Sequence, residues 1–124
     1  MQLNEKEWAD RMRGRLARSL AAYALNVPDD ALEPSARRSQ RAAAARQVAM
    51  YIAHVGLEMS LARVAAAFGR DRSTVAHACH RIEDKREDAD FDAWIEALEE
   101  AARRAPSPAG QPSADDAAAT GRRA

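Results

Sequence analysis

The 124-residue chain has one cysteine, few aromatic residues and no net charge. Because a single cysteine cannot form an internal disulfide, Cys79 is consistent with a reducing compartment. Two Phe, two Tyr and two Trp residues leave the core to be built mainly from aliphatic side chains. No stretch approaches the roughly 18 consecutive apolar residues of a membrane span, and the N-terminus lacks the apolar run of a secretory signal. We therefore expect a cytoplasmic protein without a membrane partner.

The zero net charge hides an uneven distribution along the chain. Residues 35–86 carry ten basic and four acidic side chains, whereas residues 87–124 carry four basic and nine acidic ones. A phosphate backbone responds to local charge and not to the total. The basic middle of the chain is therefore compatible with a nucleic-acid partner.

The composition, rich in alanine and arginine, favours helices throughout. An amphipathic helix is predicted from Asn4 to about Leu25, because Asn4 followed by Glu7 fits a capping box. Its apolar side chains recur at helical spacing and are Trp8, Met12, Leu16, Leu20 and Tyr23. This stripe packs either against the rest of the domain or against a partner, which includes a second copy of the chain.

A second, long helix is expected after a break at Val27-Pro28-Asp29-Asp30. Ser35 is predicted to cap this helix, which runs to about Val55. Its first half is too basic to be buried and is expected to form an exposed arm or helix start. Gly56 is expected to end the helix, since glycine tolerates positive φ.

Two short helices follow, separated by a glycine turn. Ser60 offers an N-cap for a helix that ends at Phe68, and Gly69 begins the turn. Asp71 is predicted to cap the second helix, which runs to about Lys85. Two short helices joined by a tight turn form a helix-turn-helix, whose second helix lies in the DNA major groove.

The second helix of this pair has an apolar and a polar face. Val75, Cys79 and Ile82 lie within about 60° of one another, and we expect them to face the core. The opposite face and its flanks carry Arg72, Ser73, Thr74, His77, His80 and Arg81. The all-polar first turn, residues 70–74, is where such helices meet base edges, since arginine pairs with guanine and aspartate accepts from cytosine N4.

Asp90 is predicted to cap a last helix. Its apolar stripe consists of Phe91, Trp94, Ile95 and Leu98. Beyond Arg104 the sequence has no periodicity and is expected to be disordered. The chain is therefore divided into an N-terminal amphipathic helix and linker (1–34), a helix-turn-helix domain with a C-terminal helix (35–104) and a disordered tail (105–124).

Several short segments occur in an order that is specific to one family. They are Arg46-Gln47-Val48-Ala49-Met50-Tyr51, Ser60-Leu61, Phe68-Gly69-Arg70-Asp71, Ser73-Thr74-Val75, His77-Ala78-Cys79 and Arg81-Ile82-Glu83, with Arg37-Arg38-Ser39 upstream. Over roughly residues 15–100 the chain closely resembles the C-terminal DNA-binding domain of the bacterial chromosomal replication initiator DnaA. The resemblance implies an all-α, Trp-repressor-like helical bundle with a helix-turn-helix. In that family the helix-turn-helix enters the major groove of a DNA box, and a basic arm reaches the adjacent minor groove.

Carried over by position, the resemblance implies a set of DNA-contacting residues. They are Arg37, Arg38, Arg46, His54, Arg70, Asp71, Arg72, Ser73, Thr74 and His77. Arg38 is expected in the minor groove, and residues 71–74 are expected to read bases in the major groove. His77 is expected near the DNA backbone, and Arg46 and His54 near phosphates.

The chain departs from the family pattern at the positions that read DNA. The family usually has Asp-His-Thr-Thr where this chain has Asp71-Arg72-Ser73-Thr74, and the turn is one glycine shorter than the common form. The arm is also less basic, with Gln40, Ala44 and Ala45 where basic residues or proline are typical. Each good bidentate contact contributes about 1–3 kcal/mol of base discrimination. We therefore expect either a different recognition site or weaker binding to the same box.

The predicted function is sequence-specific binding of double-stranded DNA, most simply as a transcription regulator. Its targets include the genes of a phage-like cluster as one option, and the protein is expected to be associated with the nucleoid. The chain has no Gly-x-x-x-x-Gly-Lys-Ser/Thr phosphate loop, so we expect a stand-alone relative without the ATPase module of the initiator. Two alternatives remain open. One is a replication-control protein that competes for initiator boxes, and the other is a protein-interaction adaptor on an inherited DNA-binding fold.

No enzymatic activity, cofactor or metal is expected. The sequence has no Ser/His/Asp, paired-carboxylate or Cys/His arrangement typical of catalysis. His77, Cys79 and His80 do not have the spacing of a standard zinc site, and on a helix the cysteine points away from the two histidines.

Overall fold

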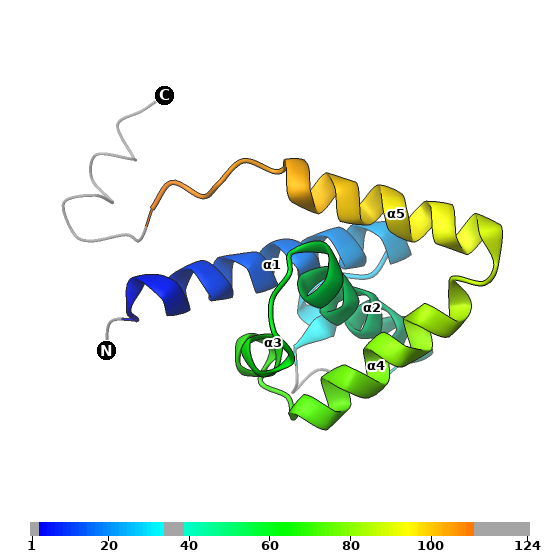
Figure 1. Ribbon diagram of the computed structural model, residues 1–124, viewed down its shortest axis with the longest axis horizontal. Helices are drawn as coiled ribbons and strands as arrows, with labels where there is room; N and C mark the ends of the chain where they lie inside the picture. Colours follow the sequence, from blue (N-terminus) through cyan, green and yellow to red (C-terminus); the bar gives the residue numbers. More distant parts are fainter. Residues whose placement is uncertain (1–2, 34–38, 111–124) are drawn as a thin grey trace.

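The computed structural model describes residues 3–33 and 39–110, and within these ranges all regular secondary structure is helical. The elements are α1 (Glu5–Leu25), a 3-10 turn η1 (Asp29–Leu32), α2 (Gln40–Tyr51), a π-helical turn η2 (Ile52–Gly56), α3 (Leu61–Phe68), α4 (Arg72–Lys85) and α5 (Ala89–Arg104). α1 and α5 lie side by side along one edge, and α3 and α4 lie on the other side of α1 (Figure 1). The predicted all-α bundle with a helix-turn-helix is confirmed.

One core joins the helices, with α2 in contact with both α1 and α4. Its largest fully buried side chains are Tyr51, Ile52, Met59, Val64, Val75, Ile82 and Ile95. They come from α2, η2, α3, α4, α5 and the loop before α3, so every one of these elements contributes to the same interior. Since burying a side chain of this size stabilises by about 1.5–3 kcal/mol, this shared core is the main force that orients α4 on α2.

α1 packs on the rest of the domain through small residues and not through the whole of its predicted apolar stripe. Its buried residues are Gly14, Ala17, Ala21 and Ala22. Leu16 and Leu20 pack against the core, whereas Tyr23 is 86% exposed and does not pack on the described part of the domain. The reason is close approach: a Cβ on Gly14 would lie 3.3 Å from the Cβ of Ala67. Side chains this small let the backbones of α1 and α3 come together.

An ion pair also connects α1 to α3. The Nε of Arg63 donates a 2.8 Å hydrogen bond to Oδ2 of Asp10, and its Nη2 donates to Oδ1 of the same carboxylate. The Asp10 side chain is 14% exposed. The hydrogen-bonded guanidinium holds the pKa of Asp10 below its ordinary value. This bidentate pair fixes the position of α1 relative to the helix-turn-helix.

Two of the predicted helix starts are confirmed. Asn4 accepts from the backbone N–H of Glu7 at 2.8 Å, and its Nδ2 donates to Oε1 of Glu7 at 2.5 Å. Ser60 caps α3 by accepting from the backbone N–H of Arg63 at 3.2 Å. Both cap residues therefore satisfy a backbone donor that has no partner within its helix.

The predicted caps Ser35 and Asp90 were wrong. α2 begins at Gln40 with Ser39 as its cap, and Ser35 lies outside the described residues. α5 begins at Ala89 because Asp88 has an extended backbone and accepts from the N–H of Phe91, which places Asp90 inside the first turn. In each case another residue has the non-helical backbone that lets a side chain reach back to the first turn.

The second helical run ends at Gly56 as predicted, but this glycine does not have a positive φ. α2 passes directly into η2, which includes Gly56, and positive φ occurs instead at Glu58 (58°). Gly56 is buried, and a Cβ there would lie 3.4 Å from Cγ of Glu99 on α5. The glycine therefore lets α5 approach η2 closely, and its conformational freedom is not what is used.

A partly buried polar network joins α2, α4 and α5. The hydroxyl of Tyr51 donates to Oε1 of Glu83 at 2.8 Å and accepts from Nη1 of Arg86 at 3.0 Å. The Arg86 guanidinium also donates to Asp92 at 2.5 Å and to Oε1 of Glu99 at 3.2 Å. Burial, with the bond to Glu83, raises the pKa of Tyr51 to about 12, so its hydroxyl keeps its proton. The network fixes the C-terminal end of α4 against α2.

The predicted disordered tail falls mostly outside the described residues. Residues 105–110 are described and form no helix, and residues 111–124 lie beyond them.

Candidate nucleic-acid interface

The turn between α3 and α4 begins at Gly69, as predicted. Gly69 ends α3 in the left-handed region with φ 64°, where glycine avoids the steric cost that other residues meet. The N–H groups of Gly69 and Arg70 bond to the carbonyls of Ala66 and Ala65 at 3.4 and 2.9 Å. These bonds close the end of α3, and the extended Asp71 then starts α4 in a new direction.

The two faces of α4 are as the sequence predicted. Val75, Cys79 and Ile82 are buried, and burial raises the pKa of the Cys79 thiol to about 11. The polar residues of the other face are all exposed, namely Arg72, Ser73, Thr74, His77, His80 and Arg81. The neutral thiol therefore serves packing, and the polar face is open to solvent.

Asp71 differs from its predicted role. It has the extended backbone of an N-cap residue, but its side chain makes no capping hydrogen bond. Its main-chain carbonyl instead accepts from the N–H of Val75 at 3.1 Å. The exposed carboxylate is thus not used by the helix, and it and the neighbouring Arg72 have no hydrogen bond or ion pair with the described residues.

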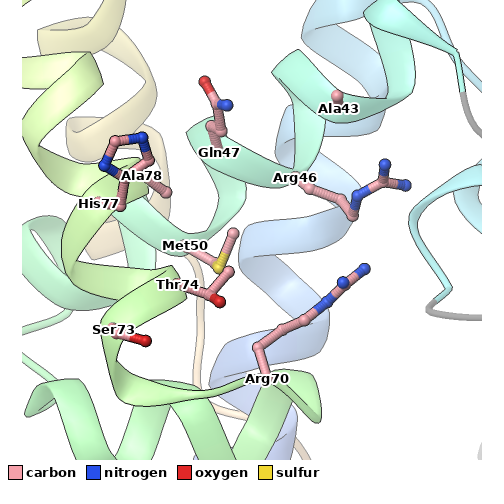
Figure 2. Close-up of a pocket in the computed structure, with 9 residues that line it drawn as sticks. All are labelled: Ala43, Arg46, Gln47, Met50, Arg70, Ser73, Thr74, His77 and Ala78. Carbon is pink, nitrogen blue, oxygen red and sulfur yellow. The ribbon is translucent and has the colours of Figure 1, made fainter.

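A groove of about 380 Å³ lies between α2 and the start of α4 (Figure 2). Its lining is Ala43, Arg46, Gln47, Met50, Arg70, Ser73, Thr74, His77 and Ala78. Figure 2 shows Met50 between the two helices and the side chains of Arg46 and Arg70 extending on the same side. Five of the predicted site residues are therefore neighbours here, from Arg46 on α2 to His77 on α4.

Gln47 is a lining residue that the sequence analysis did not select. It lies on the face of α2 that opposes α4, four residues after Ala43 and three before Met50. This helical spacing was visible in the sequence, but which face of α2 meets α4 was not. An amide that offers donors and acceptors in the same groove adds a group able to bond either a base edge or a phosphate.

Other predicted residues are placed differently. Arg46 is half-buried and donates from Nη1 to the carbonyl of Ala31 at 3.1 Å, so it also holds η1 against α2. His54 lies on η2 and outside the groove lining, with its Nδ1 2.6 Å from the carbonyl oxygen of Met59. Arg37 and Arg38 lie outside the described residues.

Comparison with known proteins identifies the family. A family model described as the bacterial dnaA protein helix-turn-helix matches residues 19–82, which is more than half of the chain. The chain belongs to the bacterial DnaA helix-turn-helix family. The helix-turn-helix of this family is a DNA-binding domain and not a catalytic domain. The chain is therefore a DNA-binding protein of the DnaA type. The resemblance predicted from the motifs is confirmed.

Curated relatives of the DnaA family match the chain over 48 residues. Chromosomal replication initiator protein DnaA 2 of Chlamydia trachomatis is 48% identical to it, and DnaA 1 of Protochlamydia amoebophila is 46% identical. The matched segment is 39% of this chain and 10% or 11% of those relatives. The chain therefore spans about a tenth of the length of the DnaA proteins it matches.

No helix among the described residues is both long and apolar enough to cross a membrane. In the same part of the chain, no group of three or more His, Cys, Asp or Glu residues is arranged to hold a metal ion.

Proposed function

We propose that this DnaA-family chain recognises specific sites in double-stranded DNA and regulates transcription from them. The observation that carries the proposal is the exposed first turn of α4. Asp71, Arg72, Ser73 and Thr74 are exposed there, and no described residue bonds their side chains. Side-chain donors and acceptors that are already satisfied within the protein cannot read bases, so their availability is what recognition requires.

Each residue of this turn suits a particular base feature. Arg72 is proposed to pair with the O6 and N7 acceptors of guanine, and Asp71 to accept from the N4 amino group of cytosine. Thr74 offers a methyl group to thymine. His77 and the arginines of the groove, Arg46 and Arg70, are proposed to contact the DNA backbone and to set the orientation of α4.

Arg38 is proposed to enter the adjacent minor groove, with Arg37 beside it. The support is the place of the segment in the chain, since it directly precedes Ser39, the cap of α2. α2 in turn supplies Arg46 and Gln47 to the groove against α4. An arm joined to this helix starts close to the proposed major-groove contacts, as minor-groove arms do in other helix-turn-helix proteins.

Selection of bound duplexes from fragments of the source genome, followed by footprinting, tests the proposal. We expect one enriched motif and a protected site whose affinity falls steeply with salt. Arg72→Gln is expected to weaken binding to this motif by about 5- to 150-fold and to relax the preference at one base pair, because a bidentate contact contributes about 1–3 kcal/mol. Arg81→Gln, also exposed on α4 but far from its first turn, is the matched control.

Two results would contradict this proposal. Site-selective binding that is unchanged in both Arg38→Ala and Arg72→Ala would contradict the assigned contacts. Binding with no preference among genomic fragments would contradict a role as a regulator of particular genes. It would also contradict binding of the protein at defined positions of the nucleoid.

A second candidate is control of replication by competition for initiator boxes. It is favoured by the printed names of the relatives, which are chromosomal replication initiator proteins. The comparison of one initiator box with one promoter fragment from the selected set separates the two functions. Because Arg72 and Ser73 replace the histidine and threonine that are usual in the family, we expect the promoter fragment to bind more tightly.

A further inference from the structure

A second groove lies beside the first and is strongly basic. It runs between α1 and the α3–α4 turn, and Arg46, Met50 and Arg70 line both grooves. Its other charged residues include Arg11 and Arg18 of α1. Among the described residues of its lining, Glu33 is the single acidic one. Four guanidinium groups thus converge on one surface that adjoins the start of α4.

The two arginines of α1 are not neutralised within the described part of the chain. Arg11 is exposed and has no hydrogen bond or ion pair there. Arg18 has neutral partners: its Nη1 lies 3.5 Å from the carbonyl oxygen of Ala67, and its guanidinium lies 5.2 Å from the centre of the Phe68 ring. These contacts fix the direction of Arg18 and leave its charge available to an anion.

The position of the groove indicates which anion it meets. When the first turn of a recognition helix enters the major groove, the phosphates of a flanking strand lie beside it. Arg46 and Arg70 stand between that turn and α1, because they line both grooves. A strand that contacts these two arginines on leaving the first groove reaches Arg11 and Arg18 next.

We infer that α1 is part of the DNA interface and that Arg11 and Arg18 bind phosphodiester groups flanking the site read by α4. The inference rests on the proposed function. It assigns to α1 a role beyond packing, and the Asp10–Arg63 pair holds the helix that carries the two arginines against α3. Arg13, on the same helix, lines a different groove together with Trp8 and Pro106 and pairs with Asp10 through Nη1 at 3.3 Å, so it provides a control for the loss of one positive charge from α1.

The experiment measures fluorescence anisotropy of the duplex enriched in the selection above, and of an unrelated duplex, at several KCl concentrations. Arg11→Gln and Arg18→Gln are each expected to make the negative slope of log affinity against log salt shallower by about 0.9, as the loss of one phosphate contact does. Between 50 and 200 mM KCl this changes the salt-induced loss of affinity by about threefold for each contact. The preference for the selected duplex should not change, and Arg13→Gln should behave like the wild type.

A duplex with neutral methylphosphonate groups at the flanking positions adds a direct readout. It should weaken binding to the wild type more than binding to Arg11→Gln, because that variant has already lost one of the two proposed phosphate contacts. Thermal unfolding of Arg18→Gln checks that the loss of the Phe68 contact leaves the fold intact, and Arg11→Gln does not depend on that contact.

Three outcomes separate the inference from the function on which it rests. If the wild type binds its selected duplex and Arg11→Gln matches Arg13→Gln in both slope and methylphosphonate response, the role of α1 is overturned while the proposed function stands. If Arg11→Gln changes the base preference, a phosphate contact is overturned. If the wild type binds no duplex, the proposed function fails and this inference fails with it.

Discussion

Asp71 and Asp88 hold the same position at the starts of α4 and α5, but only Asp88 caps its helix. Asp88 accepts from the N–H of Phe91 at 3.0 Å, whereas the carboxylate of Asp71 makes no such bond. A side chain that is well placed for a cap and is not used as one indicates another demand on it. For Asp71 that demand is, in our proposal, a base edge in the major groove.

Mutation of the two aspartates should therefore affect different properties, stability for Asp88 and DNA affinity for Asp71. Asp88→Ala is expected to lower the free energy of unfolding by about 1 kcal/mol, because a helix donor loses its acceptor. Asp71→Ala is expected to change it by less than about 0.5 kcal/mol, as is usual for an exposed residue without a specific contact, and to reduce affinity for the selected duplex. Urea denaturation and anisotropy titration measure the two effects. Equal destabilisation by both substitutions would show that Asp71 is a cap after all.

At the scale of single elements, the most informative contact is the one between α1 and α3. Asp10 and Arg63 are 53 residues apart in the sequence, and their bidentate pair is partly shielded from solvent. Because Arg63 lowers the pKa of Asp10, the charged carboxylate is the form that the folded protein favours. The pair therefore contributes stability that depends on pH.

The direction of this dependence follows from the lowered pKa. The contribution of Asp10 is fully present above its unfolded value of about 3.9, and it is lost as the pH falls through the lower folded value. Asp10→Asn is expected to destabilise the protein by about 1 kcal/mol at neutral pH, with partial exposure of Arg63 keeping the effect small. The difference in unfolding free energy between the wild type and Asp10→Asn should shrink as the pH is lowered from 7 to 3. Curves that stay parallel over this range would contradict the assignment.

At the scale of the whole molecule, the Tyr51 network links α2, α4 and α5, and Figure 1 shows how these helices are arranged. The groove of the proposed DNA interface depends on that arrangement, because α2 and α4 form its two walls. Tyr51 contacts α4 far from its first turn, because its partners Glu83 and Arg86 lie at the opposite, C-terminal end of that helix. Its effect on DNA binding is therefore through position and not through contact.

Tyr51→Phe tests this relation. The substitution removes the bonds to Glu83 and Arg86, and it is expected to cost about 1–2 kcal/mol of stability because the polar partners lose a buried hydroxyl. Tyr23→Phe is the control, because Tyr23 is 86% exposed and has no hydrogen bond to a described residue. Thermal and urea unfolding should separate the two variants. An unchanged stability of Tyr51→Phe would mean that the network does not hold the helices.

Much of the helix-turn-helix could be predicted because its signals are local. Gly69 makes the turn predicted after a short apolar helix, and Val75, Cys79 and Ile82 face the core as their spacing indicated. The errors at Ser35 and Asp90 have one source. Several residues of the right type lie near each helix end, and the backbone conformation that selects one of them is set by packing.

The sequence by itself determined the helical fold, the family and the polar character of the first turn of α4, because capping, periodicity and motif order depend on residues close together in the chain. The tertiary structure decided that small residues of α1 pack against α3, that Gln47 joins the groove, and that Arg11 and Arg18 adjoin Arg46 and Arg70. These placements depend on contacts between distant segments, such as Asp10 with Arg63. Helical spacing states which residues share a face, but the fit between helices decides which faces meet.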